Sequence, residues 1–294
     1  MKVRGRLGQA SGFARHKDIW ENPCFGTAGF LPQGELAMVG RNVELHEDGH
    51  FDTIVMNRPE RRNALSQDHM EELIGAFRTL GAGKSRGIIL AGAGPVFCAG
   101  HDFADVLGRG LGAMRALLAT CTELMTLIQS IPQPVVAKVH GLATAAGCQL
   151  VASCDLAVAS EAASFATPGG KGGWFCTTPM VAVSRSISQK RALEMLLTGD
   201  PIDAQTAAAW GLVNKVVPAD RLDEETRLLL ERATRGSGLS KGIGKQAFYA
   251  QIDLDQPKAY AYAMEVMAAT ALTEDAQEGM RAFLEKRKPT FKDR

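Results

Sequence analysis

The stretch of residues 140–160, HGLATAAGCQLVASCDLAVAS, could hold an oxygen atom that carries negative charge. Residues 141–147 form a loop of small residues, and we expect a short helix over residues 145–152 and an apolar strand after Asp155. Gly and Ala let a backbone approach a ligand closely with its N–H groups uncovered, and a helix that begins at such a turn is electropositive at its N-terminus. The same composition would also suit tight packing of a helix on a sheet.

A second stretch, residues 94–103 with the sequence GPVFCAGHDF, has the same organisation as the first. In each stretch the end of an apolar strand leads through small residues into the start of a helix. The chemical interpretation depends on the two stretches together, because either one alone is compatible with simple packing.

Strands and helices alternate through the part of the chain that contains both stretches. The pattern predicts a hairpin of residues 43–46 and 51–56, and strands at residues 87–91, 135–139 and 156–159. Ser66 is a good N-cap for a helix with an apolar stripe that includes Met70, Leu73 and Phe77. Further helices are expected at residues 112–130, 180–186, 189–197, 203–210, 220–234, 240–251, 257–272 and 274–286. This order predicts an α/β domain of stacked βαβ turns and a helical tail whose apolar stripes favour an oligomer.

Composition argues against two classes of partner. The formal net charge is +1 and 22% of the residues are charged, so the chain has no global field that would attract nucleic acid or an anionic membrane. The longest apolar run, residues 111–131, is interrupted by Arg115 and Glu123 and is not expected to span a membrane. The basic first residues predict an irregular extension, with a transit peptide as the alternative.

The six cysteines indicate a reducing compartment and no metal site. They form no CxxC pair and no cluster with histidine at the spacing of zinc ligands. In a chain of this length we therefore expect reduced thiols, as in the cytosol.

Two flanking patterns complete a recognisable arrangement around the two stretches. Residues 57–65 read NRPERRNAL, and LTG at residues 197–199 is followed by Ala208 and by GLV at residues 211–213. With residues 94–103 and 140–160, these segments resemble the crotonase superfamily, the enoyl-CoA hydratase/isomerase family, over roughly residues 42–290. The resemblance implies a ββα spiral in residues 42–218, after an extension of residues 1–41. It also implies a C-terminal helical segment, residues 219–294, that serves trimerisation and completes the acyl-CoA site. The assembly would be a homotrimer or a dimer of trimers, in a bacterial cytosol or, for a eukaryotic source, in the mitochondrial matrix.

The resemblance also implies a site for an acyl-CoA thioester as substrate, with no additional cofactor and no metal. The thioester oxygen would lie between the backbone N–H groups of His101 and Ala146. Such an oxyanion hole stabilises the enolate that forms when charge moves to that oxygen. The substrate would also be lined or bound by Ala64, Gly100, His101, Asp102, Phe103, Ala104, Ala146, Phe283 and Lys286.

The chain departs from the family pattern at the two glutamates that hydratases use. Gln149 and Gly169 occupy their positions, and neither can exchange a proton with water near neutral pH. Positioned acid–base groups contribute roughly 10²–10⁴-fold to a rate, so ordinary hydration is expected to be weak. Cys148, Cys176, Lys171 and the His101 side chain are candidate substitutes, each of which could instead be structural.

Three functions remain open from the sequence. The favoured one is an acyl-CoA-binding enzyme that polarises a thioester, with doubtful hydratase activity. The second is another reaction through the same enolate, such as isomerisation, decarboxylation or thioester hydrolysis. The third is a non-catalytic acyl-CoA-binding protein.

Overall fold

The computed structural model describes residues 40–47 and 50–294. The predicted N-terminal extension and the tip of the first hairpin therefore lie almost wholly outside the described residues. The main sheet has the strand order β1-β2-β3-β5-β7-β10. Its strands are β1 (Val43–Glu47), β2 (Phe51–Met56), β3 (Gly87–Gly92), β5 (Val135–Val139), β7 (Leu156–Ser160) and β10 (Lys215–Val217). The β1 strand pairs antiparallel with β2, which confirms the predicted hairpin, and the other neighbours are parallel.

A second sheet runs beside the first in the order β4-β6-β8-β9. It contains β4 (Val96–Cys98), β6 (Leu142–Thr144), β8 (Ser164–Ala166) and β9 (Ile202–Asp203). Each turn of the chain adds one strand to the main sheet and the next to the second sheet, as β3 and β4, β5 and β6, and β7 and β8 do. This repeat confirms the expected ββα spiral. The expectation that residues 141–147 form only a loop was wrong, because residues 142–144 pair with β4 and β8.

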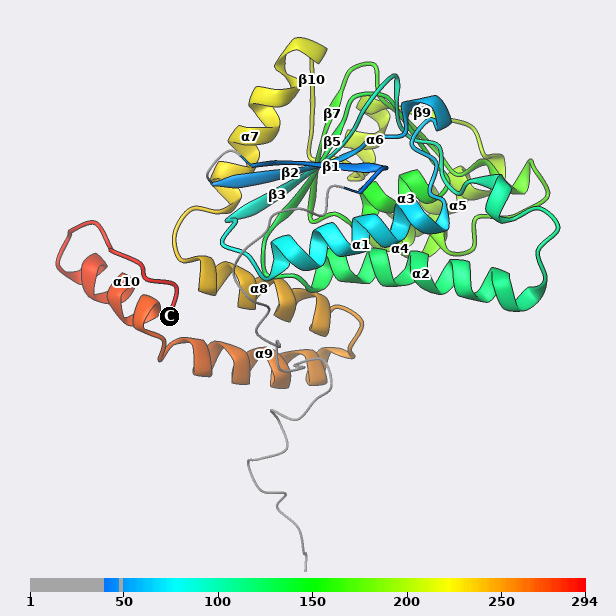
Figure 1. Ribbon diagram of the computed structural model, residues 1–294. Helices are drawn as coiled ribbons and strands as arrows, with labels where there is room; N and C mark the ends of the chain where they lie inside the picture. Colours follow the sequence, from blue (N-terminus) through cyan, green and yellow to red (C-terminus); the bar gives the residue numbers. More distant parts are fainter. Residues whose placement is uncertain (1–39, 48–49) are drawn as a thin grey trace, which may run out of the picture. The chain divides into compact units, whose positions relative to one another are not determined.

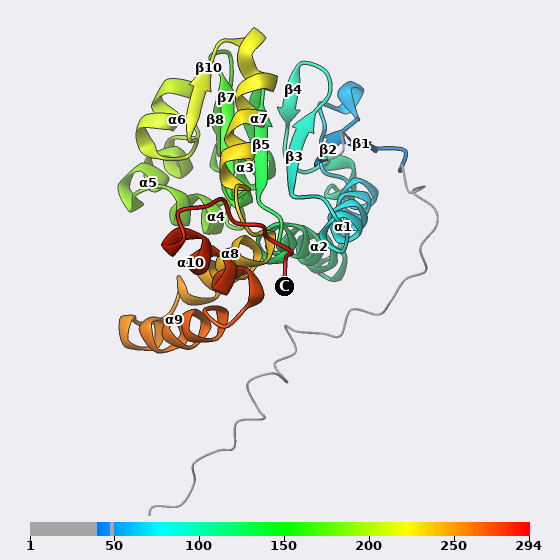
Figure 2. The ribbon, with the colours of Figure 1, turned by 90° about the vertical axis from the view of Figure 1, so that its left-hand side faces the viewer.

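Helices cover both faces of the main sheet (Figures 1 and 2). The helix α7 (Leu222–Ala233) packs on one face, against β3, β5 and β7. On the other face lie α1 (Gln67–Gly81), α2 (Leu111–Ser130) and α3 (Ala146–Ser153). Two hydrophobic cores lie on opposite faces of the main sheet, and successive residues of β3 point into them alternately. Ile88 and Leu90 belong to the larger core, whereas Ile89 packs in the smaller core under α7.

The first two helices begin and pack as the sequence predicts. The Ser66 side chain accepts a hydrogen bond from the His69 N–H at the start of α1, which is the expected N-cap. Within the described chain, α2 is a helix long and apolar enough to cross a membrane by length and composition. Its apolar side chains Leu117, Leu124 and Ile128 are buried in the core, so we interpret it as a core helix.

The remaining helices follow the spiral in the predicted order. They are α4 (Pro179–Ser186), α5 (Gln189–Thr198), α6 (Ala204–Trp210), α8 (Gly238–Gln251), α9 (Gln256–Thr270) and α10 (Glu274–Leu284). The Lys245 side chain fastens α8 to the core, because its ammonium donates to the carbonyls of Ile128 and Gln133 and pairs with Asp155 at 2.7 Å. Asp155 also accepts from the Val135 N–H, 2.7 Å away, which joins the starts of β5 and β7.

Candidate active site

The two small-residue stretches meet where their strands end. At Gly100 φ is +88°, a conformation that favours glycine. A Cβ at Gly100 would lie 2.9 Å from the Ala145 Cβ and 3.3 Å from the Ala146 nitrogen. At Gly147 a Cβ would lie 2.2 Å from the Cys98 carbonyl oxygen. The absence of side chains at these two positions is what lets the backbones of the two stretches touch.

The backbone at His101 is oriented by a short pairing with residue 65. The Leu65 N–H donates to the Gly100 carbonyl at 2.7 Å, and the Asp102 N–H donates to the Leu65 carbonyl at 3.0 Å. Because successive N–H groups of an extended chain point to opposite sides, the His101 N–H points away from Leu65. It is therefore free of this pairing and available to a ligand.

The second donor comes from the first turn of α3. Ala146 is the first residue of this helix, which has no side-chain cap, and its N–H lacks an intrahelical acceptor. The preceding residue, Ala145, has φ of +51°, and its own N–H donates to the Ala166 carbonyl at 2.9 Å. A left-handed conformation at a non-glycine residue is strained, and here it lies directly beside the predicted donor.

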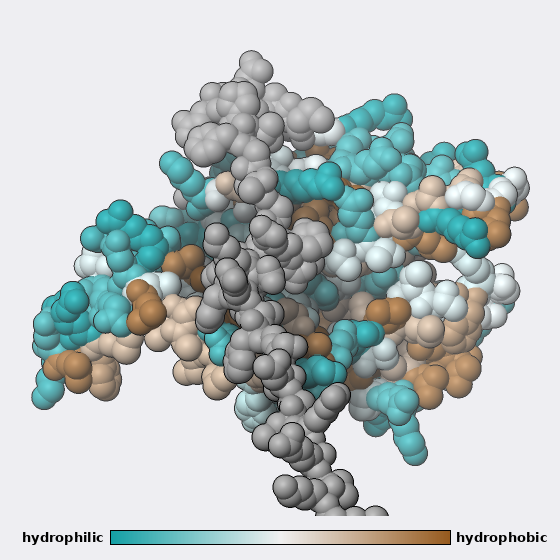
Figure 3. Space-filling model, turned by 90° about the horizontal axis from the view of Figure 1, so that it is seen from below, coloured by the Kyte–Doolittle hydropathy of each residue, from teal (hydrophilic) through white to brown (hydrophobic). Residues whose placement is uncertain are grey.

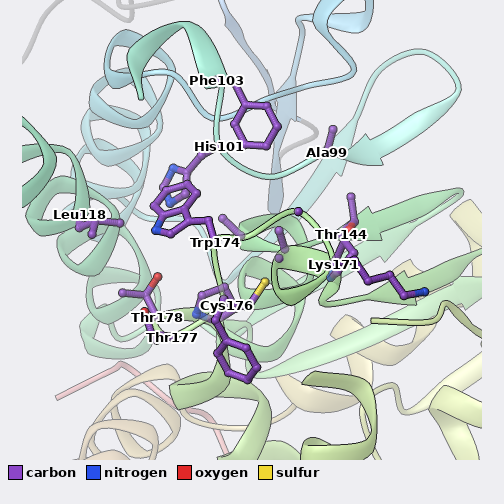
Figure 4. A pocket seen from close by; sticks show the side chains of 17 residues that line it. Ala99, His101, Phe103, Leu118, Thr144, Lys171, Trp174, Cys176, Thr177 and Thr178 are labelled. Carbon is purple, nitrogen blue, oxygen red and sulfur yellow. The ribbon is translucent and has the colours of Figure 1, made fainter. Parts of the chain in front are cut away.

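A cavity of about 470 Å³ lies at this junction (Figure 4). Most of its wall is apolar or small. It is lined by Ala99, His101, Phe103, Leu118, Thr144, Ala145, Ala146, Pro168, Gly169, Lys171, Gly172, Trp174, Phe175, Cys176, Thr177, Thr178 and Pro179. An apolar cavity with a few polar groups at one side suits a small organic ligand.

The cavity brings together four of the predicted site residues, His101, Phe103, Ala146 and Gly169. Gln149 does not line it. Gln149 lies on α3, and its buried side chain faces α2, where its amide oxygen is 4.0 Å from the Cys121 sulfur. Gly169 thus lines the cavity and Gln149 does not, and no carboxylate lines it among the described residues.

The other predicted residues of this region flank the cavity without lining it. Asp102 caps the short helix Phe103–Asp105 by accepting from the Ala104 N–H at 3.1 Å. Its carboxylate also lies 3.3 Å from the Arg58 guanidinium, which donates to the Ala64 carbonyl at 2.7 Å. Arg58 therefore links the segment that contains Ala64 to the segment that follows Gly100.

Phe283 and Lys286 do not reach the cavity of their own chain. Phe283 lies on α10 with 82% of its surface exposed. Lys286 follows the helix instead of lying on it, because α10 ends at Leu284 and Lys286 has φ of +55°. Figures 1 and 2 show α10 beside α8 and α9, below the sheets.

Three side chains that line the cavity can titrate. Burial lowers the pKa of His101, an effect that the nearby Leu65 carbonyl partly opposes, so the imidazole is neutral at pH 7. Burial raises the pKa of the Cys176 thiol, which therefore stays protonated. The Lys171 ammonium is paired with Asp200, and Figure 4 shows its side chain extending away from His101. The other candidate, Cys148, is buried outside the cavity, and its pKa is raised by burial to about 12.

Sequence reasoning missed the aromatic side of the cavity. Trp174 and Phe175 follow the glycine-rich segment of residues 169–173, and Trp174 lies against His101 with ring centroids 5.9 Å apart (Figure 4). Leu118 of α2, Thr177 and Thr178 also line the wall. The sequence signal for this wall was the pair Trp174 and Phe175, two aromatic residues that follow the glycine-rich residues 169–173 soon after a strand.

Gly169 leaves no space for a larger residue in this arrangement. A Cβ there would lie 2.1 Å from the Trp174 carbonyl oxygen and 2.8 Å from the Cys176 sulfur. The Trp174 N–H donates to the Gly169 carbonyl at 2.9 Å. The segment of residues 169–174 is thus folded back on itself at Gly169.

The cavity lacks the groups that would hold a metal. In residues 40–47 and 50–294, no cluster of three or more His, Cys, Asp or Glu side chains could bind a metal ion. The chemistry that this arrangement offers is backbone hydrogen bonding to an oxygen, beside one neutral imidazole.

Known proteins resemble the chain over most of its length. The sequence model of the enoyl-CoA hydratase/isomerase family matches residues 50–294. The mitochondrial enoyl-CoA hydratase domain-containing protein 3 of Rattus norvegicus is 42% identical over 273 residues, which cover 90% of this chain and 91% of the rat protein.

Two crystal structures are similar in fold and sequence. An enoyl-CoA hydratase of Mycobacterium smegmatis has a TM-score of 0.83 and 42% identity, covering 85% of this chain and 99% of that one. Human enoyl-Coenzyme A hydratase domain-containing protein 3 has a TM-score of 0.82 and 42% identity, covering 85% of this chain and 100% of the human one.

Proposed function

Because the chain belongs to the enoyl-CoA hydratase/isomerase family, we propose that its cavity binds the thioester end of an acyl-CoA and polarises the carbonyl group. The observation that carries this proposal is the close approach of Gly100 to Ala146 at the cavity wall. The approach allows the N–H groups of His101 and Ala146 to serve one oxygen. Preorganised donors of this kind can each contribute about 2.7–4 kcal/mol to stabilising an enolate.

The CoA portion would run from this point along the segment that follows Gly100. In the proposal, Ala64 and residues 101–104 contact the pantetheine, with their geometry held by the Arg58–Asp102 pair. Phe283 and Lys286 would meet the adenine and phosphates of a CoA bound to a neighbouring subunit. Arg287 is bound to Glu278 and Glu285, so Lys286 is the better candidate for a phosphate contact.

Hydration of an enoyl-CoA is a weak activity in this proposal. Two properties of the site support that view: the cavity lining contains no carboxylate in the described chain, and Gln149 faces α2 instead of the cavity. A site that polarises a thioester without adding water is compatible with isomerisation, decarboxylation or thioester hydrolysis through the same enolate. It is also compatible with acyl-CoA binding without turnover.

The proposed assembly is a homotrimer or a dimer of trimers. Its support is the apolar surface of the C-terminal segment of residues 219–294. Helix α9 has no buried residue, although it carries Tyr260, Met264 and Met267. The proposed compartment is the bacterial cytosol, or the mitochondrial matrix for a eukaryotic source, which would fit the rat relative that is named mitochondrial.

Calorimetry followed by a substrate panel tests this function. We expect butyryl-CoA and octanoyl-CoA to bind more tightly than free CoA, because only thioesters present an oxygen to the two donors. Mass spectrometry of saturated, enoyl and malonyl-type CoA thioesters would then identify the reaction. Absence of thioester binding would reject the proposed function, and rapid conversion of crotonyl-CoA to 3-hydroxybutyryl-CoA would reject the account of the missing glutamates.

A further inference from the structure

We propose that the His101 imidazole accepts the α-proton of a bound acyl-CoA, so that the protein exchanges this proton with solvent. This inference rests on the proposed function, because it requires the thioester oxygen to lie at the His101 and Ala146 N–H groups. It adds a proton-accepting side chain and a measurable activity.

The imidazole has both of its nitrogens buried without a hydrogen-bond partner among the described residues. The Leu65 carbonyl lies near the ring and also accepts from the Asp102 N–H at 3.0 Å; it can serve one ring nitrogen at most, so the other has no protein partner in the described chain. Buried polar atoms are nearly always satisfied, and the exceptions are concentrated where function requires them. A nitrogen that has no protein partner beside a substrate cavity is available to a substrate atom.

The position of this ring follows from the position of the oxyanion hole. The ring and the first N–H donor belong to one residue, so a thioester oxygen held by that N–H brings the adjacent α-carbon near the same side chain. Among the cavity-lining side chains, His101 is also the one that can accept a proton at pH 7. The Cys176 thiol is protonated, and the Lys171 ammonium is paired with Asp200.

The chemical step balances without any added reagent. The α C–H bond breaks, the proton goes to an imidazole nitrogen, and the electron pair moves to the thioester oxygen to give an enolate. The two backbone N–H groups stabilise the enolate. Return of a proton from the imidazolium to the α-carbon restores the thioester, and in D₂O the returned particle is a deuteron.

Trp174 controls access to the ring. Its indole packs against the imidazole (Figure 4), so an acyl group must displace the indole to reach a ring nitrogen. Gly172 and Gly173 precede the indole, and a Cβ at Gly173 would meet nothing within 4 Å.

Deuterium incorporation into butyryl-CoA in D₂O, measured by mass spectrometry, tests the proposal. His101→Gln keeps the backbone donor and removes the base, so exchange should fall by about 10²-fold or more while calorimetric affinity for butyryl-CoA stays within about threefold. His46→Gln, a change at an exposed histidine on β1, is the matched control and should exchange like the unmodified protein.

The pH dependence gives a second readout. The exchange rate should rise with pH through a midpoint below 6.5 and then level off, and Trp174→Ala should move this midpoint upward by relieving the burial of the ring. The titratable groups around the ring are Cys176, which lines the same cavity, and Asp102, paired with Arg58, on its own segment, while Lys171 lines the cavity but extends away from the ring (Figure 4) and pairs with Asp200. His101→Gln should abolish the midpoint if the imidazole titrates.

The outcomes separate the two proposals. Failure of the unmodified protein to bind butyryl-CoA would reject the proposed function. Binding without deuterium exchange, or exchange that His101→Gln leaves intact, would overturn the inference about His101 alone.

Discussion

His69 is buried as a neutral side chain, and its protonation should destabilise the protein. Its Nδ1 lies 3.1 Å from the Ala64 carbonyl oxygen, while Nε2 is buried without a partner in the described chain. Burial, aided by the Arg58 charge and opposed by the Ala64 carbonyl and Glu72, lowers the pKa from 6.5 to about 4. The unfolded chain therefore binds an additional proton between these two pH values.

Stability should consequently fall as the pH falls from about 6.5 to about 4. At 1.4 kcal/mol per pKa unit, the contribution of His69 to this loss approaches about 3 kcal/mol. Chemical denaturation at fixed protein concentration and several pH values measures it. His69→Gln should reduce the pH dependence in this window by about that amount relative to the unmodified protein. Equal slopes for His69→Gln and the unmodified protein would contradict the assignment.

That His101 and Ala146 lie at one site was predicted from the resemblance of their motifs to the family, and their role as backbone donors stays a prediction. His101 and Ala146 both line the cavity. The direction of the Gln149 side chain could not be predicted, because it depends on how α3 rotates against α2. Its amide lies beside Cys121, a contact between residues far apart in the sequence.

Glycine contacts hold the two loops together, and a methyl group at Gly147 should separate them. The new Cβ would lie 2.2 Å from the Cys98 carbonyl, which is backbone and cannot move aside cheaply. Gly147→Ala should lower the free energy of unfolding by about 1–3 kcal/mol and weaken butyryl-CoA binding.

Gly75→Ala is the matched control for this helical glycine. Gly75 lies within α1, where a Cβ would meet nothing within 4 Å. The change should raise the free energy of unfolding by about 0.5–1 kcal/mol and leave butyryl-CoA binding unaltered. Denaturation and calorimetry would check both variants, and equal stability for the two would refute the packing argument.

Replacing Gln149 and Gly169 by glutamate should not by itself create a hydratase. The sequence alone suggests that the pair would restore the missing acid–base groups. In the folded protein, however, any Cβ at Gly169 collides with the Trp174 carbonyl at 2.1 Å, and Gln149 faces Cys121.

We therefore expect Gln149→Glu combined with Gly169→Glu to destabilise the protein, with crotonyl-CoA hydration rising less than about tenfold, below the usual range for positioned acid–base groups. Gln149→Glu alone separates the effect of the buried charge from that of the disrupted segment. Thermal unfolding and an absorbance assay at saturating crotonyl-CoA give the two readouts. A stable double variant with rapid hydration would show that the segment of residues 169–174 adapts readily.

The longer elements were predictable because each has enough residues to display a period. The helices of residues 67–81 and 111–130 and the strands β3, β5 and β7 follow from their apolar patterns. The strands β4, β6, β8, β9 and β10 have two or three residues each, which is too few for a pattern to appear. Their pairing partners lie far away in the sequence: β10 extends the main sheet beside β7, and β4, β6, β8 and β9 form the second sheet.

The C-terminal helices expose more apolar surface than a soluble monomer usually tolerates. The view from the side of α8 and α9 shows apolar residues exposed among hydrophilic ones (Figure 3). Tyr260, Met264 and Met267 on α9 and Phe283 and Leu284 on α10 are all largely exposed. Their composition predicts helices, but the sequence does not determine what covers them. Large apolar side chains exposed on the surface are often covered by a partner protein.

A glutamate on α9 should therefore weaken the proposed trimer and, with it, the CoA site. Met267→Glu would place a charge in the contact, and a loss of about 1.4 kcal/mol already weakens association tenfold. Leu193→Glu, at an exposed leucine on α5, introduces the same charge outside residues 219–294 and should preserve the assembly. Light scattering coupled to chromatography gives the mass, and calorimetry gives the affinity for butyryl-CoA and for free CoA.

The two measurements together test whether the neighbouring subunit completes the site. If Phe283 and Lys286 reach the CoA of a neighbouring subunit, dissociation of the assembly by Met267→Glu should lower the affinities for free CoA and for butyryl-CoA by similar factors. Both ligands carry the same adenine and phosphates. Butyryl-CoA should still bind more tightly than CoA, since the His101 and Ala146 donors remain within one chain. A dissociated variant that binds free CoA as well as the unmodified protein does would show that each chain holds the nucleotide alone.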